Sequence, residues 1–489
     1  MDYRVLLSSF ERLHDVGTWP RQRVIHACLR DAILSGSLAS GSRLLASRAL
    51  ADELGIARNT VVYAYDQLAT EGLTSAGPRG TRVSPLASPR SGASANAATP
   101  ASAAIARRMQ GLRALPAADA EAVGFAPGVP ALASFPLPVW RRALERAWRS
   151  MASSDLNYGD IAGVLALRRE ISAYLGATRG VRCEPDQVFV TSSTQSSLEI
   201  CALTFADPGD TAWIENPGYI GALAAFRAAQ LRTIGIAVDA GGIAASAHDW
   251  RQLKPKLVYT TPSHQYPTGT VLDMPRRLAL IEQAKAAGAL IIEDDYDSEF
   301  RYEGPPLPAM QGLANDAPVI YLGTFSKTMF PAIRTGFMVV PPNLAGPLRS
   351  VLARMAPHGR VADQLALADF LRSGQFGVHL RRMRRLYRSR RDLLVEMLQR
   401  HAGDAVVVHG SSAGIHLSLQ FADPALVDTE VAAAAMEMGV VARALSAHAT
   451  GLRQHGWNGL VLGYSQVEEA QMEAKVTTLV RAFRPCLRQ

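Results

Sequence analysis

The sequence contains little lysine and little cysteine. Only five lysines occur among 51 basic residues, at positions 254, 256, 285, 327 and 475. Each of them merits attention, because the amine of lysine can lose its proton and form an imine, whereas the guanidinium of arginine stays charged. The four cysteines include no CxxC pair, which argues against a zinc ribbon or a disulfide framework and fits a reducing compartment.

Long apolar segments are also missing. No uncharged apolar run reaches the length that spans a membrane, and the N-terminus lacks the charged-then-apolar pattern of a signal peptide. We therefore expect a soluble, cytoplasmic protein with no membrane partner. A content of 48% hydrophobic and 19% charged residues predicts a folded chain, and 489 residues suffice for two or three domains. The net charge of +8 is compatible with nucleic acid as a partner.

The composition changes sharply after Val83. Residues 84–104 are almost all Ser, Ala, Pro, Gly and Thr, so they cannot bury an apolar face and predict a flexible linker that extends to about residue 120. The chain is therefore expected to divide into a small domain over 1–83, a linker over 84–120 and a large domain over 121–489.

The small domain shows the pattern of a winged helix-turn-helix. Apolar residues recur at three- and four-residue spacing over 21–36, which predicts an amphipathic helix. A short helix capped by Ser47 and ended by Gly55 should follow, and then a helix over 57–72. The loop LGI between these two short helices is typical of a helix-turn-helix, and the segment TSAGPRGTRVS predicts a hairpin, or wing.

The large domain alternates helical stretches with short β-prone runs. The runs are QVFVT, TAWIE, KLVYTT, ALIIEDD, VIYLGT and FMVVP. This rhythm predicts an α/β fold with a mainly parallel sheet, in which the ligand lies at the carboxyl ends of the strands. The polar residues that follow each run are therefore the candidate site residues.

Two of these strand ends supply hydroxyl groups and an aromatic ring. After QVFV, a helix opens with Ser193, Thr194 and Gln195, whose hydroxyl groups and free backbone amides suit a phosphate. An ordinary Ser/Thr helix cap is the alternative for this segment, and taken alone it is favoured. After TAWIE, Tyr219 follows a tight Asn-Pro-Gly turn, where its ring can stack on a flat ligand.

Two further strand ends supply charge. Asp294 ends a buried run, where a carboxylate is costly unless it meets a cation. Lys327 follows VIYLGTFS, and Arg334 comes seven residues later, within reach of a phosphate. One ligand accounts for all these groups, namely pyridoxal 5'-phosphate. Its aldehyde forms an imine with lysine, and a carboxylate keeps its pyridine nitrogen protonated.

From about residue 125 onward the chain resembles the fold-type I aminotransferases. The resemblance is carried by FAPGVPALASFP, YGDIAG, VTSSTQSSLEI, ENPGY, SHQYPTG, IIEDDYDSEFRY, YLGTFSKTMFPAIRTGF and HLRRMRRLYRSRRDLL. The basic run in the last of these also occurs in plain aminotransferases, so a solvated or subunit-contact helix is favoured over a nucleic-acid site.

The resemblance implies a role for each matching residue. Lys327 would be the catalytic residue and hold the cofactor as an imine, and Asp294 would pair with the pyridine nitrogen. Tyr296 would contact the ring oxygen, and Tyr219 would stack on the ring. Tyr158 would reach the cofactor of a second subunit, since these proteins are dimers with shared sites. The phosphate would be surrounded by Ser193, Thr194, Thr324, Ser326 and Arg334.

The first eighty or so residues resemble the GntR-type winged helix-turn-helix. The matching segments are AILSGSLASGSRL, SRALADELGIARNTVVYAYDQLATEG and GPRGTRV. In that family the second helix of the motif enters the major groove of double-stranded DNA and the wing reaches the adjacent groove. The resemblance therefore implies DNA contacts from Arg48, Arg58, Asn59, Thr60, Arg79 and Gly80.

The two resemblances in this order are similar to the MocR-type, or GabR-type, regulators. This implies a homodimeric transcription regulator that senses an amine, an amino acid or pyridoxal 5'-phosphate itself. Its targets would be genes of amino-compound or vitamin B6 metabolism. A working aminotransferase with an accessory DNA-binding domain is the alternative. A scaffold with a dead cofactor site is disfavoured, because Lys327, Asp294, Tyr296 and Arg334 are all intact.

Three departures from the aminotransferase pattern favour a sensor over an enzyme. Tyr266 replaces the asparagine before Pro-Thr-Gly, and Val461 replaces the arginine that fixes the substrate carboxylate. Gly221 offers no side chain for an acid, whereas some family members have an arginine near this position. Without a carboxylate clamp, a substrate is not held for repeated proton transfer.

The sequence offers candidates that replace the lost contacts. His264 and Gln265 are the candidates for the polar contact that Tyr266 does not make. Arg453 is the candidate for the missing arginine. No residue points to a metal site.

Overall fold

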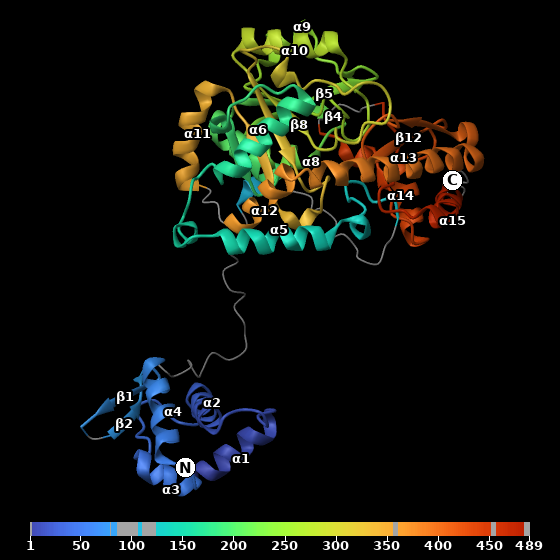
Figure 1. The fold of residues 1–489 in the computed structure, drawn as a ribbon. Coiled ribbons are helices and arrows are strands. Elements are labelled where there is room, and N and C mark those ends of the chain that lie inside the picture. Colours follow the sequence, from blue (N-terminus) through green and yellow to red (C-terminus); the bar gives the residue numbers. More distant parts are fainter. Residues whose placement is uncertain are drawn as a thin grey trace. The chain divides into compact units, whose positions relative to one another are not determined.

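The computed structural model describes residues 2–78, 80–85, 106–109, 124–355, 360–450 and 456–483. The chain divides into two compact units, residues 1–104 and residues 105–489. Most of the predicted linker, 86–105 and 110–120, lies outside the described residues. Each unit is described by itself below (Figure 1).

The smaller unit is a set of helices followed by a two-stranded hairpin. Its elements are α1 (Tyr3–Leu13), α2 (Arg21–Leu34), α3 (Ser47–Leu54), α4 (Arg58–Thr70), β1 (Thr74–Gly77) and β2 (Gly80–Val83). α2 and α4 pack through a buried apolar core that includes Ile25, Leu29, Val61 and Leu68. β1 and β2 pair antiparallel as the predicted wing.

Local sequence explains where the helices of this unit end. α3 ends at Gly55, which adopts φ 66° and ψ 36°, the left-handed conformation that glycine adopts at low cost. The expectation that Ser47 caps α3 is wrong, because Ala46 occupies the cap position and Ser47 is the first helical residue. The helix α1 was not expected. Asp2 caps it through hydrogen bonds that its side chain accepts from the N–H groups of Arg4 and Val5.

The larger unit is built on an eight-stranded sheet, which confirms the predicted α/β class. The strand order is β3-β10-β9-β8-β7-β4-β5-β6, with β4, β5, β7, β8 and β9 parallel and β10 antiparallel to both neighbours. The strands are β3 (Val188–Thr191), β4 (Thr211–Asn216), β5 (Arg232–Asp239), β6 (Gly242–Ile243), β7 (Leu257–Thr260), β8 (Leu290–Asp295), β9 (Val319–Thr324) and β10 (Gly336–Val339).

Helices cover this sheet, and α5 and α12 pack together on the side of the unit opposite α9 and α10 (Figure 1). The central strands are buried throughout, as expected for a parallel sheet covered on both faces. The helices are α5 (Leu137–Ser150), α6 (Leu165–Arg179), α7 (Thr194–Phe205), α8 (Ile220–Ala228), α9 (Ala247–Leu253), α10 (Met274–Ala287), α11 (Pro342–Met355), α12 (Val361–Arg372), α13 (Gln375–His401), α14 (Asp428–Glu437) and α15 (Glu469–Arg481).

A second, four-stranded sheet follows near the C-terminus and was not predicted. Its order is β11-β12-β14-β13, and every pair is antiparallel. The strands are β11 (Val406–His409), β12 (His416–Phe421), β13 (Arg443–Ala444) and β14 (Gly459–Gly463). Short single-turn helices connect the larger elements at η2 (Arg107–Met109), η3 (Leu132–Ser134), η4 (Ser153–Leu156), η5 (Pro185–Gln187), η6 (Met310–Gly312), η7 (Pro331–Ile333), η8 (Gly403–Ala405) and η9 (Ser446–His448).

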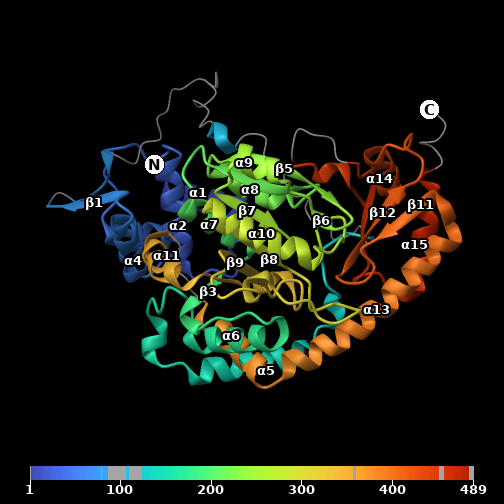
Figure 2. The same ribbon diagram turned by 90° about the horizontal axis from the view of Figure 1, so that it is seen from above.

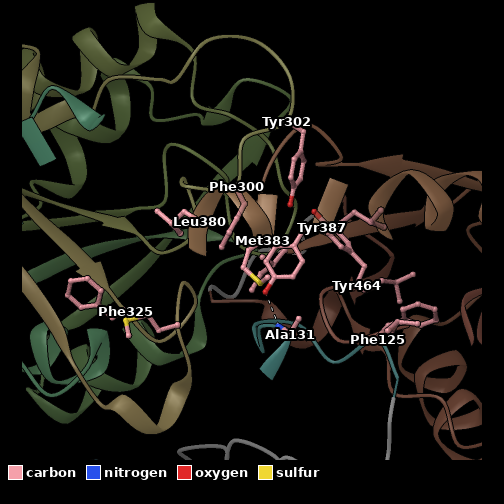
Figure 3. Close-up of a cluster of buried hydrophobic side chains, with 14 of the residues drawn as sticks. Phe125, Ala131, Phe300, Tyr302, Phe325, Leu380, Met383, Tyr387 and Tyr464 are labelled. Carbon is pink, nitrogen blue, oxygen red and sulfur yellow. Dashed lines mark hydrogen bonds between the residues drawn. The ribbon is translucent and has the colours of Figure 1, made fainter. Parts of the chain in front are cut away.

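The long helix α13 joins the two sheets into one core. It runs along the edge of the unit, from the region of α5 and α6 to the C-terminal sheet (Figure 2). Its residues Leu380, Met383 and Tyr387 lie in an apolar cluster (Figure 3), and the Ala131 N–H donates a hydrogen bond of 2.9 Å to the Tyr387 hydroxyl. Phe325, two residues before Lys327, belongs to the same cluster, so the lysine turn is anchored in the core.

Candidate cofactor site and DNA-binding surface

The carboxyl end of the large sheet brings Asp294 and Lys327 together. In the parallel β8–β9 ladder Asp294 pairs with Leu322, and β9 ends at Thr324, three residues before Lys327. The opposite charges of Asp294 and Lys327 lie close enough to act on each other's protonation. The sequence predicts that these two groups share one edge of the sheet, and the structure places them there.

Lys327 is held in a half-buried position by the loop that precedes α5. Its Nζ donates a hydrogen bond of 2.6 Å to the carbonyl oxygen of Gly128. Gly128 has φ +83°, and a Cβ at that position would lie 2.9 Å from Nζ, so the contact requires glycine. Burial lowers the pKa of the Lys327 ammonium, and the charges of Asp297 and Asp294 oppose this shift. A lowered pKa favours the neutral amine, which is the nucleophilic form.

Asp294 is a buried carboxylate with one unused oxygen. It is 4% exposed, and its Oδ2 accepts a hydrogen bond of 2.8 Å from the Tyr259 hydroxyl. Its Oδ1 has no hydrogen-bond partner among the described residues. Burial raises the pKa of Asp294 to about 7, whereas the bond from Tyr259 acts to lower it. A cationic N–H donor would satisfy Oδ1 and compensate the charge, which is what a protonated pyridine nitrogen provides.

Two tyrosines flank this carboxylate. Tyr219 precedes α8, and its ring centroid lies 6.5 Å from that of Tyr259. Tyr296 directly follows β8, and its hydroxyl donates a hydrogen bond of 2.8 Å to the carbonyl oxygen of His264. Burial raises the pKa of both phenols, to about 12 for Tyr219, so both keep their protons at neutral pH. Tyr219 can therefore act as a hydrogen-bond donor, whereas the single O–H of Tyr296 is already bound to the carbonyl oxygen of His264.

Strand pairing brings together the residues that were assigned to a phosphate. Gly336 pairs with Thr191 on one side and with Thr324 on the other. Ser193, Ser326 and Arg334 each lie two residues from one of these three paired positions, so their backbones meet at one edge of the sheet.

This edge carries both amides and a free cation. Ser193 caps α7, whose first amides, those of Thr194 and Gln195, face the end of the helix. Thr324 Oγ1 accepts a hydrogen bond of 3.1 Å from the N–H of Ser326. Arg334 adopts the left-handed conformation (φ 46°, ψ 48°), and its exposed guanidinium makes no hydrogen bond or ion pair within the described part of the chain. Amides and a free arginine are a donor set that fits a phosphate group.

The side chain of Gln195 explains why position 221 is a glycine. Its amide donates a hydrogen bond of 3.2 Å to the carbonyl oxygen of Gly221. A Cβ on Gly221 would lie 2.4 Å from the ring of Tyr219 and 2.6 Å from Gln195 Oε1. An arginine at this position therefore could not coexist with the observed placement of Tyr219.

Tyr158 is not brought to the site of its own chain. Its side chain is 89% exposed and makes no hydrogen bond within the described ranges. Large apolar side chains are also exposed nearby in the sequence, at Leu137, Trp148 and Leu156. Such exposed apolar side chains are typical of a surface that another molecule covers.

The structure separates the two candidates that were expected to replace the lost asparagine. Gln265 is not available, because its amide binds Glu215 Oε2 and two backbone carbonyl oxygens. His264 contacts the Tyr296 hydroxyl, with its Nδ1 3.3 Å away, although Asp297 Oδ2 at 3.1 Å and the carbonyl oxygen of Gly410 at 3.2 Å engage its two ring nitrogens. His264 is therefore the polar group beside Tyr296, the residue assigned to the ring oxygen of the cofactor.

His264, Asp297 and His416 form a buried cluster whose potential ligand atoms lie within 4.8 Å of one another. Hydrogen bonds already occupy much of it: His264 Nε2 lies 3.2 Å from the carbonyl oxygen of Gly410, and Asp297 Oδ2 accepts from the N–H of Ile415 at 3.3 Å. We interpret the cluster as a hydrogen-bonded support for Tyr296, because these bonds explain its geometry without an ion.

The second sheet places an arginine that the sequence reasoning missed. Arg443 on β13 pairs directly with Val461 on β14, the position where an arginine was expected. Directly paired residues of an antiparallel ladder lie on the same face, so Arg443 shares the face of Val461. Arg453, the candidate that had been considered, lies outside the described residues. Only the strand pairing, which is not visible in the sequence, could have identified Arg443.

In the smaller unit, the residues predicted to contact DNA lie on the helix-turn-helix and the wing. Arg48 on α3, together with Arg58 and Asn59 at the start of α4, is exposed, and Thr60 is half-buried in the same turn. Gly80 begins the second wing strand, and Arg79 lies outside the described residues. The sequence-based set of DNA contacts did not include Arg43. Its guanidinium lies against Gly80 of the wing, and a Cβ on Gly80 would lie 3.0 Å from Arg43 Nε.

Two family models match the chain. The model of class I and II aminotransferases matches residues 120–457, and the model of bacterial regulatory proteins of the gntR family matches residues 21–83. The chain is 37% identical over 467 residues to the probable rhizopine catabolism regulatory protein MocR of Rhizobium meliloti, covering 95% of this chain and 94% of the relative. It is 34% identical over 453 residues to the pyridoxine biosynthesis transcriptional regulator PdxR of Corynebacterium glutamicum, covering 90% and 91%.

Solved structures match the larger unit. The α-aminoadipate aminotransferase LysN of Thermus thermophilus, solved with N-(5'-phosphopyridoxyl)-L-leucine, aligns with a TM-score of 0.68 and 27% identity, over 74% of this chain and 92% of that one. Kynurenine aminotransferase of Pyrococcus horikoshii aligns with a TM-score of 0.70 and 26% identity, over 76% and 93%. Among the helices of the described residues, none is both long and apolar enough to cross a bilayer.

Proposed function

We propose a function from one premise: the chain belongs to the MocR-type transcription regulators, which join a gntR-family DNA-binding region to an aminotransferase class I and II domain. As a member, it is a regulator that depends on pyridoxal 5'-phosphate. The proposal concerns what it senses, namely an amine, an amino acid or pyridoxal 5'-phosphate itself. It controls genes of amino-compound or vitamin B6 metabolism and acts in the cytoplasm, where its DNA lies.

The observation that carries the proposal is that Lys327 lies at the same sheet edge as Asp294, whose Oδ1 has no partner among the described residues. Pyridoxal 5'-phosphate supplies, when bound, an aldehyde that captures a primary amine and a ring that withdraws electrons. Lys327 Nζ would be the amine that holds the cofactor through its aldehyde carbon, and its lowered pKa supports this role. Asp294 Oδ1, which lacks a partner among the described residues, would accept a hydrogen bond from the protonated pyridine nitrogen.

The remaining residues orient the cofactor. Tyr219 would stack on the ring, and the hydroxyl of Tyr296, whose O–H bonds to the carbonyl oxygen of His264, would contact the ring oxygen. The phosphate would lie where β3, β9 and β10 meet, since this edge combines helix amides with the guanidinium of Arg334, which has no partner among the described residues. The residues assigned to the phosphate are Ser193, Thr194, Gln195, Thr324, Ser326 and Arg334.

A homodimer is part of the proposal. The 89% exposed side chain of Tyr158 is assigned to the cofactor site of a second copy. Two copies carry two winged helices, so the preferred DNA would be a duplex with a repeated half-site, in direct or inverted orientation. A bound effector can change the occupancy of such DNA only as far as it binds the two states of the protein differently.

A working aminotransferase is the second candidate. The presence of Lys327, Asp294, Tyr296 and Arg334 favours it, because these residues suffice to hold the cofactor. Val461 counts against it, since a buried valine cannot fix a carboxylate for repeated turnover.

The experiment that tests the proposal has two parts. The first is the visible absorption of the purified protein after loading with pyridoxal 5'-phosphate, compared with the variants Lys327→Ala and Lys256→Ala. Lys256 is an exposed lysine, so its variant is the matched control. We expect a protein-bound absorption band in the wild type and in Lys256→Ala and none in Lys327→Ala. A band that persists in Lys327→Ala would refute the assignment of the lysine.

The second part measures DNA binding by fluorescence anisotropy, with a duplex from the region upstream of the chain's own gene. The affinity should fall steeply with salt, because the winged helix contacts phosphates. Amines that change the absorption should also change the affinity for this duplex. Binding that ignores salt, or no binding, would contradict the regulator. A full conversion of the bound cofactor to its amine form with repeated turnover would support the aminotransferase instead.

A further inference from the structure

The basic motif HLRRMRRLYRSRRDLL forms the central part of α13, and the proposed function uses none of its residues. One side of the helix is solvated, because five arginines of the motif are exposed, namely Arg381, Arg382, Arg384, Arg385 and Arg388. His379, Met383 and Tyr387 are buried and follow one another at four-residue spacing, so they share the opposite face. This buried face carries two polar side chains, those of His379 and Tyr387, whose partners lie around Lys327.

His379 holds the turn that carries Lys327. It is 5% exposed, and its Nε2 lies 2.8 Å from the carbonyl oxygen of Thr328, the residue that follows the lysine. A carbonyl oxygen only accepts hydrogen bonds, so Nε2 carries the proton and donates it. Burial lowers the pKa of His379, which keeps the ring neutral. Because Thr328 is buried as well, removal of the imidazole would take the donor from a carbonyl oxygen that water does not reach.

Aromatic packing fixes the same turn a second time. The ring of His379 packs edge-on against Phe135, with the centroids 5.4 Å apart and the planes at 78°. Phe135 in turn packs edge-on against Phe330, at 4.8 Å and 69°. Phe330 lies three residues after Lys327, so the histidine contacts the lysine turn through its backbone and through this aromatic pair. Edge-to-face packing of this kind restricts how the rings can move.

Tyr387 holds the segment that Lys327 contacts on its other side. Its buried hydroxyl accepts a hydrogen bond of 2.9 Å from the N–H of Ala131 (Figure 3). Ala131 lies three residues after Gly128, whose carbonyl oxygen accepts the 2.6 Å hydrogen bond from Lys327 Nζ. One face of α13 therefore supports both the backbone of the lysine turn and the backbone against which the lysine amine lies.

We propose that His379 and Tyr387 are positioning residues for Lys327, and that α13 sets the distance between the lysine turn and the Gly128 segment through their two hydrogen bonds. This inference rests on the proposed function, because Lys327 is assumed to hold the cofactor. Both residues act on the backbone around the lysine, and neither is assigned a contact with the cofactor. The motif that begins at His379 then serves the cofactor site through its buried face.

Loss of this support should change how the protonation of Lys327 limits cofactor binding. Burial lowers the pKa of its ammonium, and a looser turn would admit water and raise that pKa toward its ordinary value. Only the neutral amine attacks an aldehyde, so cofactor affinity should fall at pH 7 and recover in part at pH 9. Asp297 and Asp294, the charges that act on Lys327, stay in place in every variant. A general loss of stability would not follow the proton of the lysine in this way.

The test titrates pyridoxal 5'-phosphate into the cofactor-free, full-length protein at pH 7 and at pH 9 and follows the visible absorption band. The variants are His379→Leu, Tyr387→Phe and His379→Gln, whose side-chain amide can still donate to the carbonyl oxygen of Thr328. The matched control is Leu394→Ala, a fully buried position on the same helix, where a cavity costs stability without touching either hydrogen bond. Urea unfolding of each variant reports its stability.

We expect the half-saturating cofactor concentration at pH 7 to rise by about 10-fold in His379→Leu and by about 5-fold in Tyr387→Phe, as the loss of a buried hydrogen bond implies. Both differences should shrink at pH 9. His379→Gln should stay close to the wild type, and so should Leu394→Ala, although the control should lose at least as much stability as His379→Leu.

The inference is overturned if Leu394→Ala binds the cofactor as weakly as His379→Leu, or if the differences are equal at the two pH values. Should His379→Leu not fold, Tyr387→Phe, which removes a single oxygen atom, carries the same comparison. The outcome is separable from the proposed function. If the wild type develops no band, the proposed function fails. If the wild type develops the band and the variants match its affinity, only the positioning role of His379 and Tyr387 fails.

Discussion

Replacing Asp294 by asparagine should stabilise the cofactor-free protein, and more so at pH 8 than at pH 5. Burial raises the pKa of Asp294 from its ordinary 3.8 to about 7, so the folded protein disfavours the ionised carboxylate. The difference of about three pH units corresponds to about 4 kcal/mol, at 1.36 kcal/mol for each unit. Asparagine carries no charge and can still accept the hydrogen bond from Tyr259, so the variant avoids this cost.

The sign follows from the protons bound in each state. Between pH 3.8 and about 7 the folded protein holds the proton of Asp294 and the unfolded chain has released it, so stability falls as pH rises through this window and levels off above it. The advantage of Asp294→Asn should therefore be about 2 kcal/mol at pH 5, which is about one unit above 3.8, and about 4 kcal/mol at pH 8.

Urea unfolding of the cofactor-free protein, followed by tryptophan fluorescence at both pH values, measures this difference. Burial also raises the pKa of Glu299 to about 7, but that residue is present in both proteins, so the comparison isolates Asp294. Asp207→Asn, at an exposed position, is the control and should change stability by less than about 0.5 kcal/mol. Equal stabilisation at the two pH values, or destabilisation at pH 8, would refute the reasoning.

Three further changes test other parts of the molecule. Tyr259→Phe removes the 2.8 Å hydrogen bond to the buried carboxylate and should weaken the binding of pyridoxal 5'-phosphate by about 10-fold or more, measured by fluorescence titration; an unchanged affinity would contradict this role. Gly221→Arg should cost about 1–3 kcal/mol and lower cofactor affinity, because its Cβ would lie 2.4 Å from the Tyr219 ring; calorimetry and the same titration would expose a variant that instead gains acid binding. Arg58→Ala should weaken DNA binding and reduce the slope of log affinity against log salt by about 1, and an unreduced slope would place the phosphate contact elsewhere.

Sequence periodicity predicted the large sheet well because its strands are short buried runs between amphipathic helices. Each of the six β-prone runs forms a strand of the eight-stranded sheet, and the α/β class follows from this alternation. The residues at or just after the ends of these runs include Asp294, Lys327 and Tyr219, which the fold brings to one edge of the sheet. This worked because all parallel strands of a sheet end on the same side, so position along the chain determines position in the site.

The C-terminal sheet could not be predicted from the periodicity of the sequence. β13 is only two residues long, and an antiparallel strand of that length has no recognisable period. The groups that complete the site from this side depend on pairing between strands: Arg443 faces the site because it lies opposite Val461, and His416 because it lies two residues from the partner of Val461. Likewise, Gly128 belongs to the site because it contacts Lys327, and Tyr259 because it contacts Asp294. No local sequence pattern encodes either contact.

The loss of an expected arginine at one position is therefore weak evidence that the function has been lost. Val461 lacks the charge of the expected arginine, and the sequence analysis used this loss to favour a sensor over an enzyme. In an antiparallel ladder, however, the facing position on the next strand has its Cβ only about 4.5–5.5 Å away on the same face, a shift that the long side chain of arginine can span. Arg443 occupies that facing position and has no partner of its own within the described residues. A charge can reach a given point of the site from more than one position on the same face of the sheet. In this protein the charge lies on Arg443, on the same face as Val461.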